Sequence, residues 1–467
     1  MTERVVMTGT CLTHDWIPSV SGQLGQLAMF PPEVLRLILL KAGGRKVRIL
    51  SNGLKRLFDE ANTTLLVDLH QIPADSCLVG RSVSNMIRDS KALVSITVKN
   101  HYLSALRIFV PLLPTLEGLK TLDLSNNGIG SDGATVLAPS LMALTGLQLL
   151  DLSSNFFGPG GAAPLASALS SMTDLHTLNL SRNYIDPDGA ISLTPALMVL
   201  TRLHTLDLSF NCMGPAGAAA AASALVALTG LRYLNIEHND LNSAGIASLT
   251  PALKELSQLE SLILSQNSMG PSGAASLASS LIPLVQLHTL DLSFCQLGTS
   301  GMSSLAPSLI KLMALHTLDL SNNDIAPDGA TLLAPVLKAL TRLRSLDISC
   351  NDIGSAGAAS LAPSLMMLTG LSTLRLSQNE LGATGAATLA PSLTALTGLH
   401  TLDLSLNNIR LVGAASLAPS LSLLTGLHTL DLSYNGPTSL AHVLSAVTGP
   451  LAHLNLKDCP LSDEEDD

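Results

Sequence analysis

The chain has 467 residues, and its 35 acidic side chains against 25 basic ones give a formal net charge of −10. This balance argues against a surface that follows nucleic-acid phosphates and favours neutral or basic protein partners. Only 3% of the residues are aromatic, so the core must consist of many small and medium side chains, which suits thin stacked layers.

The first 26 residues form an N-terminal segment without targeting or membrane features. They lack the basic stretch and apolar run of a secretory signal peptide, and no apolar run in the chain approaches the ~18 residues of a membrane span. The six cysteines are scattered without CxxC spacing and are expected to be reduced thiols. We therefore expect a soluble protein of the cytoplasm or nucleus that contacts no membrane.

Residues 27–61 are predicted to be a short helical segment. Pro31 and Pro32 favour the first turn of a helix, and Glu33 suits the positive end of its dipole. The stretch resembles the opening of an F-box, which has Leu-Pro-x-Glu followed by apolar residues and Ile-Leu. The residues that carry the resemblance are Phe30, Pro31, Glu33, Leu35, Ile38 and Leu39.

The second half of the F-box pattern is incomplete, since the usual Val-Cys and Trp are missing. The resemblance implies docking on the linker protein of an SCF-type ubiquitin ligase. A helical cap that covers the core of the first repeat explains the same residues. Both interpretations stay open.

A leucine recurs at a constant spacing of 28 residues through residues 119–446, which predicts twelve repeats of one structural unit. These leucines are Leu119, Leu147, Leu175, Leu203, Leu231, Leu259, Leu287, Leu315, Leu343, Leu371, Leu399 and Leu427. Residues 62–118 hold a degenerate copy with Ile96 and Val98, and residues 447–461 hold a copy shortened by four, so both are predicted to be capping repeats. Residues 462–467 form an acidic tail that should stay solvated.

Each repeat opens with LxxLxLxxN, as at Leu119, Leu122, Leu124 and Asn127. The alternation predicts a short strand with inward leucines, and an inward Asn can satisfy backbone groups from one coil to the next. Cys295 replaces this Asn in one repeat, which should be locally looser.

The second half of each repeat has apolar residues at helical spacing and should pack on the strand layer. Eight repeats carry proline at one position of this helix: Pro139, Pro195, Pro251, Pro307, Pro335, Pro363, Pro391 and Pro419. Because proline favours the first turn of a helix and disfavours its interior, we predict kinked or broken convex helices whose well-formed part starts at the proline.

The unit LxxLxLxxNxIGxxGAxxLAPSLxxLTG resembles the ribonuclease-inhibitor-like class of leucine-rich repeats over roughly residues 90–460. The resemblance implies an α/β solenoid of horseshoe shape, with parallel strands on the concave face and helices on the convex face. Members of this class mainly bind proteins.

Two sets of outward residues are candidates for binding a partner on the concave face. Eight strands carry a central Asp: Asp123, Asp151, Asp207, Asp291, Asp319, Asp347, Asp403 and Asp431. Neighbouring carboxylates would repel and a basic partner would relieve this, although solvated Asp is also an ordinary residue for such a position. Aromatic and Arg side chains dominate binding hot spots, so the other candidates are Arg182, Phe210, Phe294, Arg375 and Tyr434.

Histidines fall on adjacent strands in three pairs: His176 and His204, His288 and His316, and His400 and His428. Such pairs could bind zinc or respond to pH, but no third ligand is evident. No phosphate-binding loop, HExxH, GxSxG or CxxC pattern is present. We therefore predict no catalytic residue, cofactor or metal.

The main hypothesis is a non-catalytic protein-binding adaptor that combines the concave face with the F-box-like segment, as a substrate-recognition subunit of a ubiquitin ligase would. One alternative is an enzyme regulator, either an inhibitor like the ribonuclease inhibitors or an activator like the Ran GTPase-activating proteins, although no residue can be matched to a catalytic Arg. The other is a structural scaffold without a single client.

Overall fold

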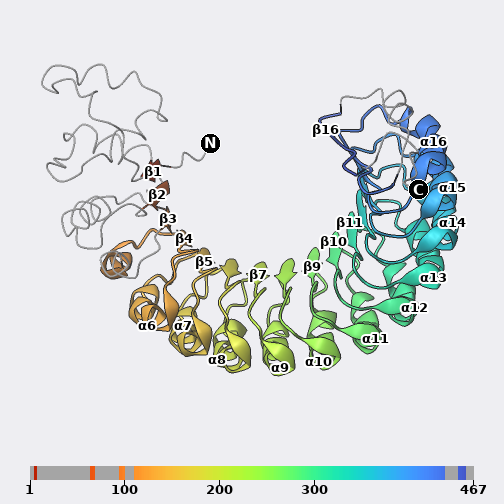
Figure 1. The fold of residues 1–467 in the computed structure, drawn as a ribbon. Coiled ribbons are helices and arrows are strands. Elements are labelled where there is room, and N and C mark those ends of the chain that lie inside the picture. Colours follow the sequence, from red (N-terminus) through yellow and green to blue (C-terminus); the bar gives the residue numbers. More distant parts are fainter. Residues whose placement is uncertain (1–4, 8–63, 69–93, 100–109, 437–450, 459–467) are drawn as a thin grey trace, which may run out of the picture. The chain divides into compact units, whose positions relative to one another are not determined.

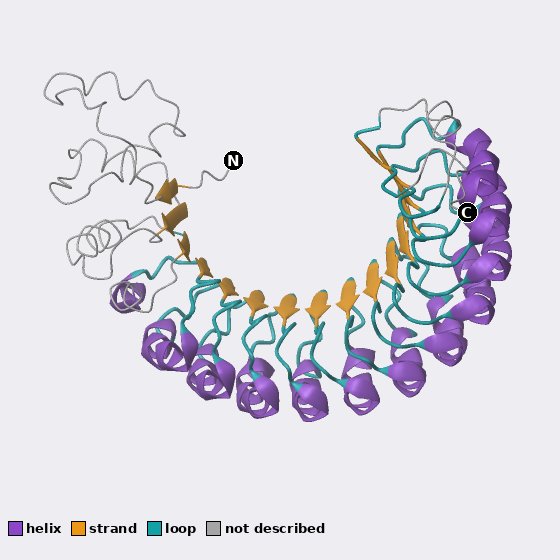
Figure 2. Ribbon diagram, in the orientation of Figure 1, coloured by secondary structure: helices purple, strands orange, loops and turns teal. Residues whose placement is uncertain are grey.

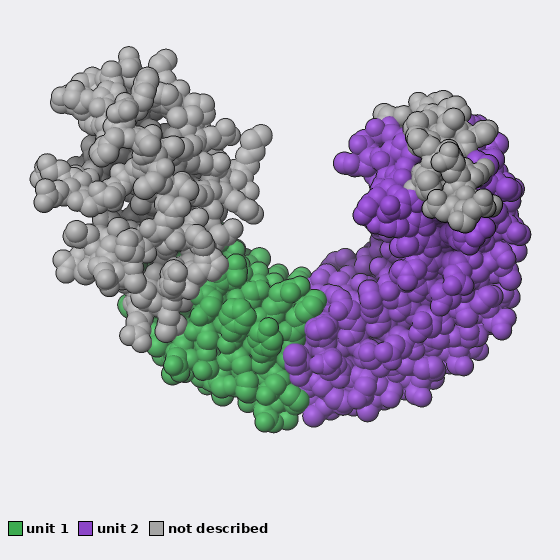
Figure 3. All heavy atoms as spheres, viewed as in Figure 1, with its two compact units in different colours: residues 1–211 green, residues 212–467 purple. Residues whose placement is uncertain are grey.

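The structure is a computed structural model that describes residues 5–7, 64–68, 94–99, 110–436 and 451–458. Two compact units divide the chain, unit 1 at residues 1–211 and unit 2 at residues 212–467 (Figure 3). The predicted F-box-like segment, residues 27–61, and the acidic tail, residues 462–467, lie outside the described residues.

Unit 1 is a stack of parallel strands covered by helices on one side. Its strands pair in chain order and are β1 (Val5–Met7), β2 (Thr64–Asp68), β3 (Ser95–Lys99), β4 (Thr121–Asp123), β5 (Leu149–Asp151), β6 (Thr177–Asn179) and β7 (Thr205–Asp207). The 3-10 helix η1 (Val110–Thr115) and the helices α6 (Gly130–Leu141), α7 (Gly158–Leu169) and α8 (Asp186–Val199) follow their strands (Figure 1).

Unit 2 continues the same strand-and-helix pattern. Its strands are β8 (Tyr233–Asn235), β9 (Ser261–Ile263), β10 (Thr289–Asp291), β11 (Thr317–Asp319), β12 (Ser345–Asp347), β13 (Thr373–Arg375), β14 (Thr401–Asp403), β15 (Thr429–Asp431) and β16 (His453–Asn455). Its helices are α9 (Gly214–Leu225), α10 (Asn242–Glu255), α11 (Gly270–Leu281), α12 (Gly298–Leu309), α13 (Ala326–Ala339), α14 (Gly354–Leu365), α15 (Gly382–Leu393) and α16 (Arg410–Leu421). The strands lie on the inner side of the unit and the helices on its outer side (Figure 2).

The strand register confirms the predicted repeat. Thr289 of β10 lies opposite Thr317 of β11, which is the 28-residue spacing, and Thr429 of β15 lies opposite His453 of β16, which is the shortened spacing. At the other end, β3 pairs with β4. The strands of the degenerate copies before and after the regular repeats therefore extend the sheet.

The core lies between the strand layer and the helix layer. In β4 to β15 the middle leucine of each strand, such as Leu290, is buried, while most of the residues on either side of it are only partly covered. On the helices, the small Ala274 and the larger Leu277 and Leu281 face the same layer and are fully buried. Burying one apolar layer after another is favourable at roughly 25 cal/mol per Å² of apolar surface, which explains how a chain with few aromatics has a continuous core.

The inward Asn forms the predicted ladder between repeats. Asn155 Oδ1 accepts from the N–H of Asn127 at 3.0 Å and of Ile129 at 3.4 Å. Its Nδ2 donates to the carbonyl oxygens of Leu124, Leu152 and Ser153 at 2.8–3.1 Å. One buried amide thus satisfies backbone groups of two successive repeats, and the prediction from the sequence is confirmed.

Cys295 occupies the ladder position in the repeat that begins at Leu287. Its thiol donates to the Leu264 carbonyl at 3.4 Å, whereas an Asn amide donates to three carbonyls. Burial raises the pKa of this thiol to about 12, so it stays protonated. The ladder is weaker here because sulfur is a poor donor and acceptor.

The helices correct the prediction about the prolines. Each of the eight prolines lies inside a helix that starts well before it, as Pro139 does in α6, Gly130–Leu141. The start is set by the neighbouring repeat, since Gly130 has a φ of 65° and its N–H donates to the Asn155 carbonyl. Pro139 is exposed near the helix end, where losing one hydrogen bond to solvent is tolerated, so the helix is neither broken at the proline nor begun by it.

Candidate functional site

The strand face consists of the first and third residues of each strand, whose side chains point away from the core. The eight predicted aspartates all occupy the third position and are here called the acidic column. Strand pairing places Asp123 beside Asp151 in unit 1. In unit 2 it places Asp319 between Asp291 and Asp347, and Asp403 beside Asp431.

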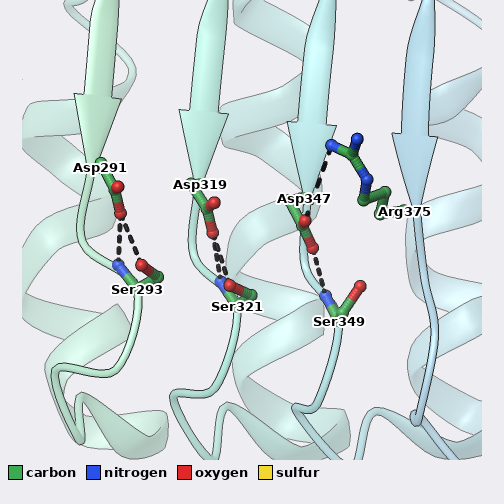
Figure 4. A network of polar contacts seen from close by, with 7 residues as sticks. All are labelled: Asp291, Ser293, Asp319, Ser321, Asp347, Ser349 and Arg375. Atoms are coloured by element: carbon green, nitrogen blue, oxygen red, sulfur yellow. Dashed lines mark hydrogen bonds and ion pairs between the residues drawn. The ribbon is translucent and has the colours of Figure 1, made fainter. Parts of the chain in front are cut away.

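One oxygen of each acidic-column carboxylate is used within its own repeat. Asp291 Oδ1 accepts from the backbone N–H of Ser293 at 2.9 Å and from its hydroxyl at 2.7 Å. Asp319 and Ser321 repeat this arrangement on the next strand (Figure 4). The aspartates are therefore partly buried and close the end of the strand.

The second carboxylate oxygen accepts a donor from the following strand wherever the chain provides one. Asn179 Nδ2 donates to Asp151 Oδ2 at 3.2 Å, and Asn455 Nδ2 donates to Asp431 Oδ2 at 2.8 Å. The Arg375 guanidinium lies 3.9 Å from Asp347 Oδ2 (Figure 4). Strand spacing thus positions Oδ2 for an N–H donor or a cation.

Asp319 has a carboxylate neighbour on each side instead of a donor. Burial and, to a smaller extent, the charges of Asp347 and Asp291 raise its pKa to about 6, against the lowering effect of the hydrogen bonds from Ser321. Burial, together with the charge of Asp123, likewise raises the pKa of Asp151. Asp319 therefore holds negative charge at a cost that a cationic group near β10, β11 and β12 would relieve.

Four of the five predicted aromatic and Arg candidates lie in the loop that follows a strand, whereas Arg375 is the last residue of β13. Arg182 lies with its guanidinium carbon 3.9 Å from the centroid of the Phe210 ring in unit 1. In unit 2, Phe294 is half exposed, and the Lys457 ammonium lies 5.2 Å from the Tyr434 ring centroid. Of these residues, Arg182 and Phe210 belong to unit 1, and Phe294 and Tyr434 belong to unit 2.

Two exposed aromatic residues of the same loops were not identified from the sequence. Phe156 and Tyr184 each expose 58% of their surface and stack with ring centroids 5.9 Å apart and planes at 15°. The signal was present two residues after the variable loop position, where the other repeats carry Gly, Cys or polar residues. The helical half of the consensus begins there, so the repeat pattern alone does not mark these side chains as outward-pointing.

The histidine pairs lie where the sequence placed them. The ring centroids of His288 and His316 are 4.9 Å apart, and His400 and His428 stack at 5.3 Å. Burial lowers the pKa of His316, and the charge of His288 lowers it further. Within the described ranges, no group of three or more His, Cys, Asp or Glu side chains could hold a metal ion.

A search of the described helices for membrane-spanning length and apolarity finds none that qualifies.

Comparison with known proteins identifies the repeat. The family described as Leucine Rich repeat matches residues 119–138, 171–193, 199–220, 228–249, 257–278, 287–306, 311–334, 339–362 and 396–418. No curated protein matches the chain.

Solved structures with similarity to the chain include two bacterial proteins. An internalin from Listeria monocytogenes is 20% identical, with a TM-score of 0.42, over 71% of this chain and 87% of its own. A leucine-rich-repeat protein from Leptospira interrogans is 20% identical, with a TM-score of 0.49, over 77% of this chain and 89% of its own.

Proposed function

Because the chain is a leucine-rich-repeat protein, we propose that it is a non-catalytic protein-binding scaffold that holds a partner on the strand face. The observation that carries the proposal is that the two oxygens of an acidic-column carboxylate have different partners. One oxygen of Asp319 accepts a hydrogen bond from Ser321. The equivalent second oxygens of Asp151 and Asp347 lie beside a donor from the following strand.

The proposed partner presents Lys or Arg side chains to Asp291, Asp319 and Asp347. Arg375 shows how such a cation would lie, because its guanidinium approaches Asp347 from the next strand. A cation between two of these strands would offset the repulsion that contributes to the raised pKa of Asp319. Opposite charge across an interface also speeds association and selects among partners.

The test compares two variants of the full chain that lose the same charge. The strand-face variant carries Asp291→Asn, Asp319→Asn and Asp347→Asn, and Asn is a natural residue of this position, as at Asn179. The control variant carries Asp132→Asn, Asp188→Asn and Asp328→Asn, which are exposed residues in first turns of helices.

Partners are captured from cell extract and quantified by mass spectrometry at low and moderate salt. We expect at least one partner to be retained by the unchanged chain and the control variant and to be lost from the strand-face variant. Identical partner sets for all three proteins would refute the strand face as the binding surface.

The more specific proposal is a ubiquitin-ligase adaptor of the cytoplasm or nucleus, and it rests on the F-box-like sequence of residues 27–61. Its test is a second capture with Phe30→Ala, Glu33→Lys and Ile38→Asp in the full chain. Recovery of an SCF-type linker and a cullin by the unchanged chain alone would support it. Equal recovery by both proteins would make residues 27–61 a structural cap and leave the scaffold proposal intact.

A further inference from the structure

Four side chains of unit 1 form a surface that the acidic column does not explain. The aromatic platform consists of Phe156, Arg182, Tyr184 and Phe210, on three successive loops after β5, β6 and β7. Building on the scaffold function proposed above, we propose that the aromatic platform binds an extended protein segment that carries a carboxylate near a proline or aromatic side chain.

The apolar half of the platform is the exposed pair of Phe156 and Tyr184. Their rings stack on each other and still expose 58% of each residue. Large exposed aromatics on adjacent repeats are uncommon on a soluble surface and typical of binding hot spots. A proline or aromatic side chain of a partner can lie against these rings and remove their surface from water.

The charged half of the platform is Arg182. Between residues 110 and 211, unit 1 has three Lys or Arg side chains: Lys120, Arg182 and Arg202. The Lys120 ammonium donates to the Gly146 carbonyl at 2.9 Å, and Arg202 pairs with Asp174. The Arg182 guanidinium rests on the Phe210 ring at 3.9 Å, with no carboxylate within ion-pair distance among the described side chains. Its N–H groups can therefore donate to a carboxylate from a partner while Phe210 covers one face.

The loops hold these side chains in fixed directions. Phe156, Arg182, Tyr184 and Phe210 all have φ between 54° and 58°. The Arg182 N–H also donates to the Ser209 carbonyl at 2.9 Å, which ties its loop to the next one. A preorganised loop loses little conformational entropy when a partner binds.

The spacing sets the length of the segment. Neighbouring strands lie about 4.8 Å apart, so the loops of Phe156 and Phe210 are separated by on the order of 10 Å, which an extended chain covers with about three residues. An apolar side chain against the rings of Phe156 and Tyr184 thus places a carboxylate about two residues away, over Arg182.

A protein segment fits this platform better than a single-stranded nucleic acid. Stacked aromatics and Arg can bind bases, but nucleic-acid binding also needs a positively charged path for the phosphates. The same loops and strands carry Asp151, Asp186 and Asp207, which repel a polyanion. A single carboxylate needs only Arg182.

The test uses peptides of defined chemistry and variants drawn from the same loop positions of this chain. A displayed library of random peptides of about ten residues is selected on the full chain and on Arg182→Gln, since Gln266 and Gln378 occupy that position naturally. The apolar half is removed by Phe156→Ser with Tyr184→Ser, as in Ser268. Phe294→Asn, as in Asn322, is the matched control in unit 2.

A synthetic peptide from the selection and its Glu→Gln or Asp→Asn version are then measured by fluorescence anisotropy. We expect enrichment of an acidic residue near proline or an aromatic residue. Arg182→Gln and the double Ser variant should each weaken binding by at least about tenfold, as should the neutral peptide, and Phe294→Asn should not.

Two results would overturn the proposal. One is that the selected peptides share no acidic residue near a proline or aromatic residue, or that they bind the platform variants and the unchanged chain equally well. The other is binding of a labelled polyuridine RNA, lost in the same variants, which would make the platform a nucleic-acid site. If partner capture depends on the acidic column while the platform variants bind normally, this proposal fails and the scaffold function stands.

Discussion

Replacing Cys295 by Asn should stabilise the repeats around β9 and β10, because it would complete the Asn ladder. An Asn at this position can accept from the Asn267 and Met269 N–H groups and donate to the carbonyls of Leu264 and Leu292, by analogy with Asn155. The present thiol already donates to the Leu264 carbonyl at 3.4 Å and accepts from the Asn267 N–H, so the new bonds are those to Met269, Leu292 and, by analogy with Asn155, Ser293. The exchange adds about three buried hydrogen bonds of roughly 0.5–1.5 kcal/mol each, less the cost of burying an amide, for a net gain of about 1–3 kcal/mol.

The effect is local, because the stability of a repeat array is a sum of repeat and interface terms. Amide hydrogen exchange is therefore the assay, and residues 264–269 should exchange about 10–100-fold more slowly in Cys295→Asn. The matched reverse variant, Asn323→Cys, should speed the exchange of the preceding repeat by a similar factor. Unchanged or faster exchange in Cys295→Asn, or no effect of Asn323→Cys, would refute the hydrogen-bond explanation of the ladder.

Two further variants test the acidic column and the helix packing. The folded-state pKa of Asp319, about 6, lies above its ordinary 3.8, so protonation stabilises the folded protein as pH falls from about 7 to 4. Asp319→Asn can still accept from Ser321. In thermal unfolding it should raise the stability at pH 8 by on the order of 1 kcal/mol and lose that advantage by pH 4. An equal gain in stability at both pH values would contradict the raised pKa. Gly357→Ala places a Cβ against Ile353 Cγ2 and 3.0 Å from Ala330 Cβ, so the melting temperature should fall. Gly370→Ala has no atom within 4 Å of the new Cβ and should leave the melting temperature nearly unchanged.

The repeat could be predicted from the sequence because its determinants recur at fixed spacing. The alternating leucines of β10 predicted the strand. Asn155 predicted the ladder, because a buried corner of the backbone needs a side chain with both donor and acceptor groups. The helix start could not be predicted in the same way. It depends on the Asn155 carbonyl, 25 positions further along the chain, which accepts from the Gly130 N–H. Local proline preference is weaker than this contact between repeats.

The candidate surface was predicted only in part for a related reason. A repeated Asp looks the same in sequence whichever groups its two oxygens accept from, and only the structure shows the partner of each oxygen. Asp319 uses one oxygen for Ser321, and the equivalent second oxygens of Asp151 and Asp431 accept amides from the following strand. Asn at such a position keeps the first bond and removes the charge. Substituting Asn rather than Ala therefore separates the contribution of the acidic column to folding from its contribution to binding.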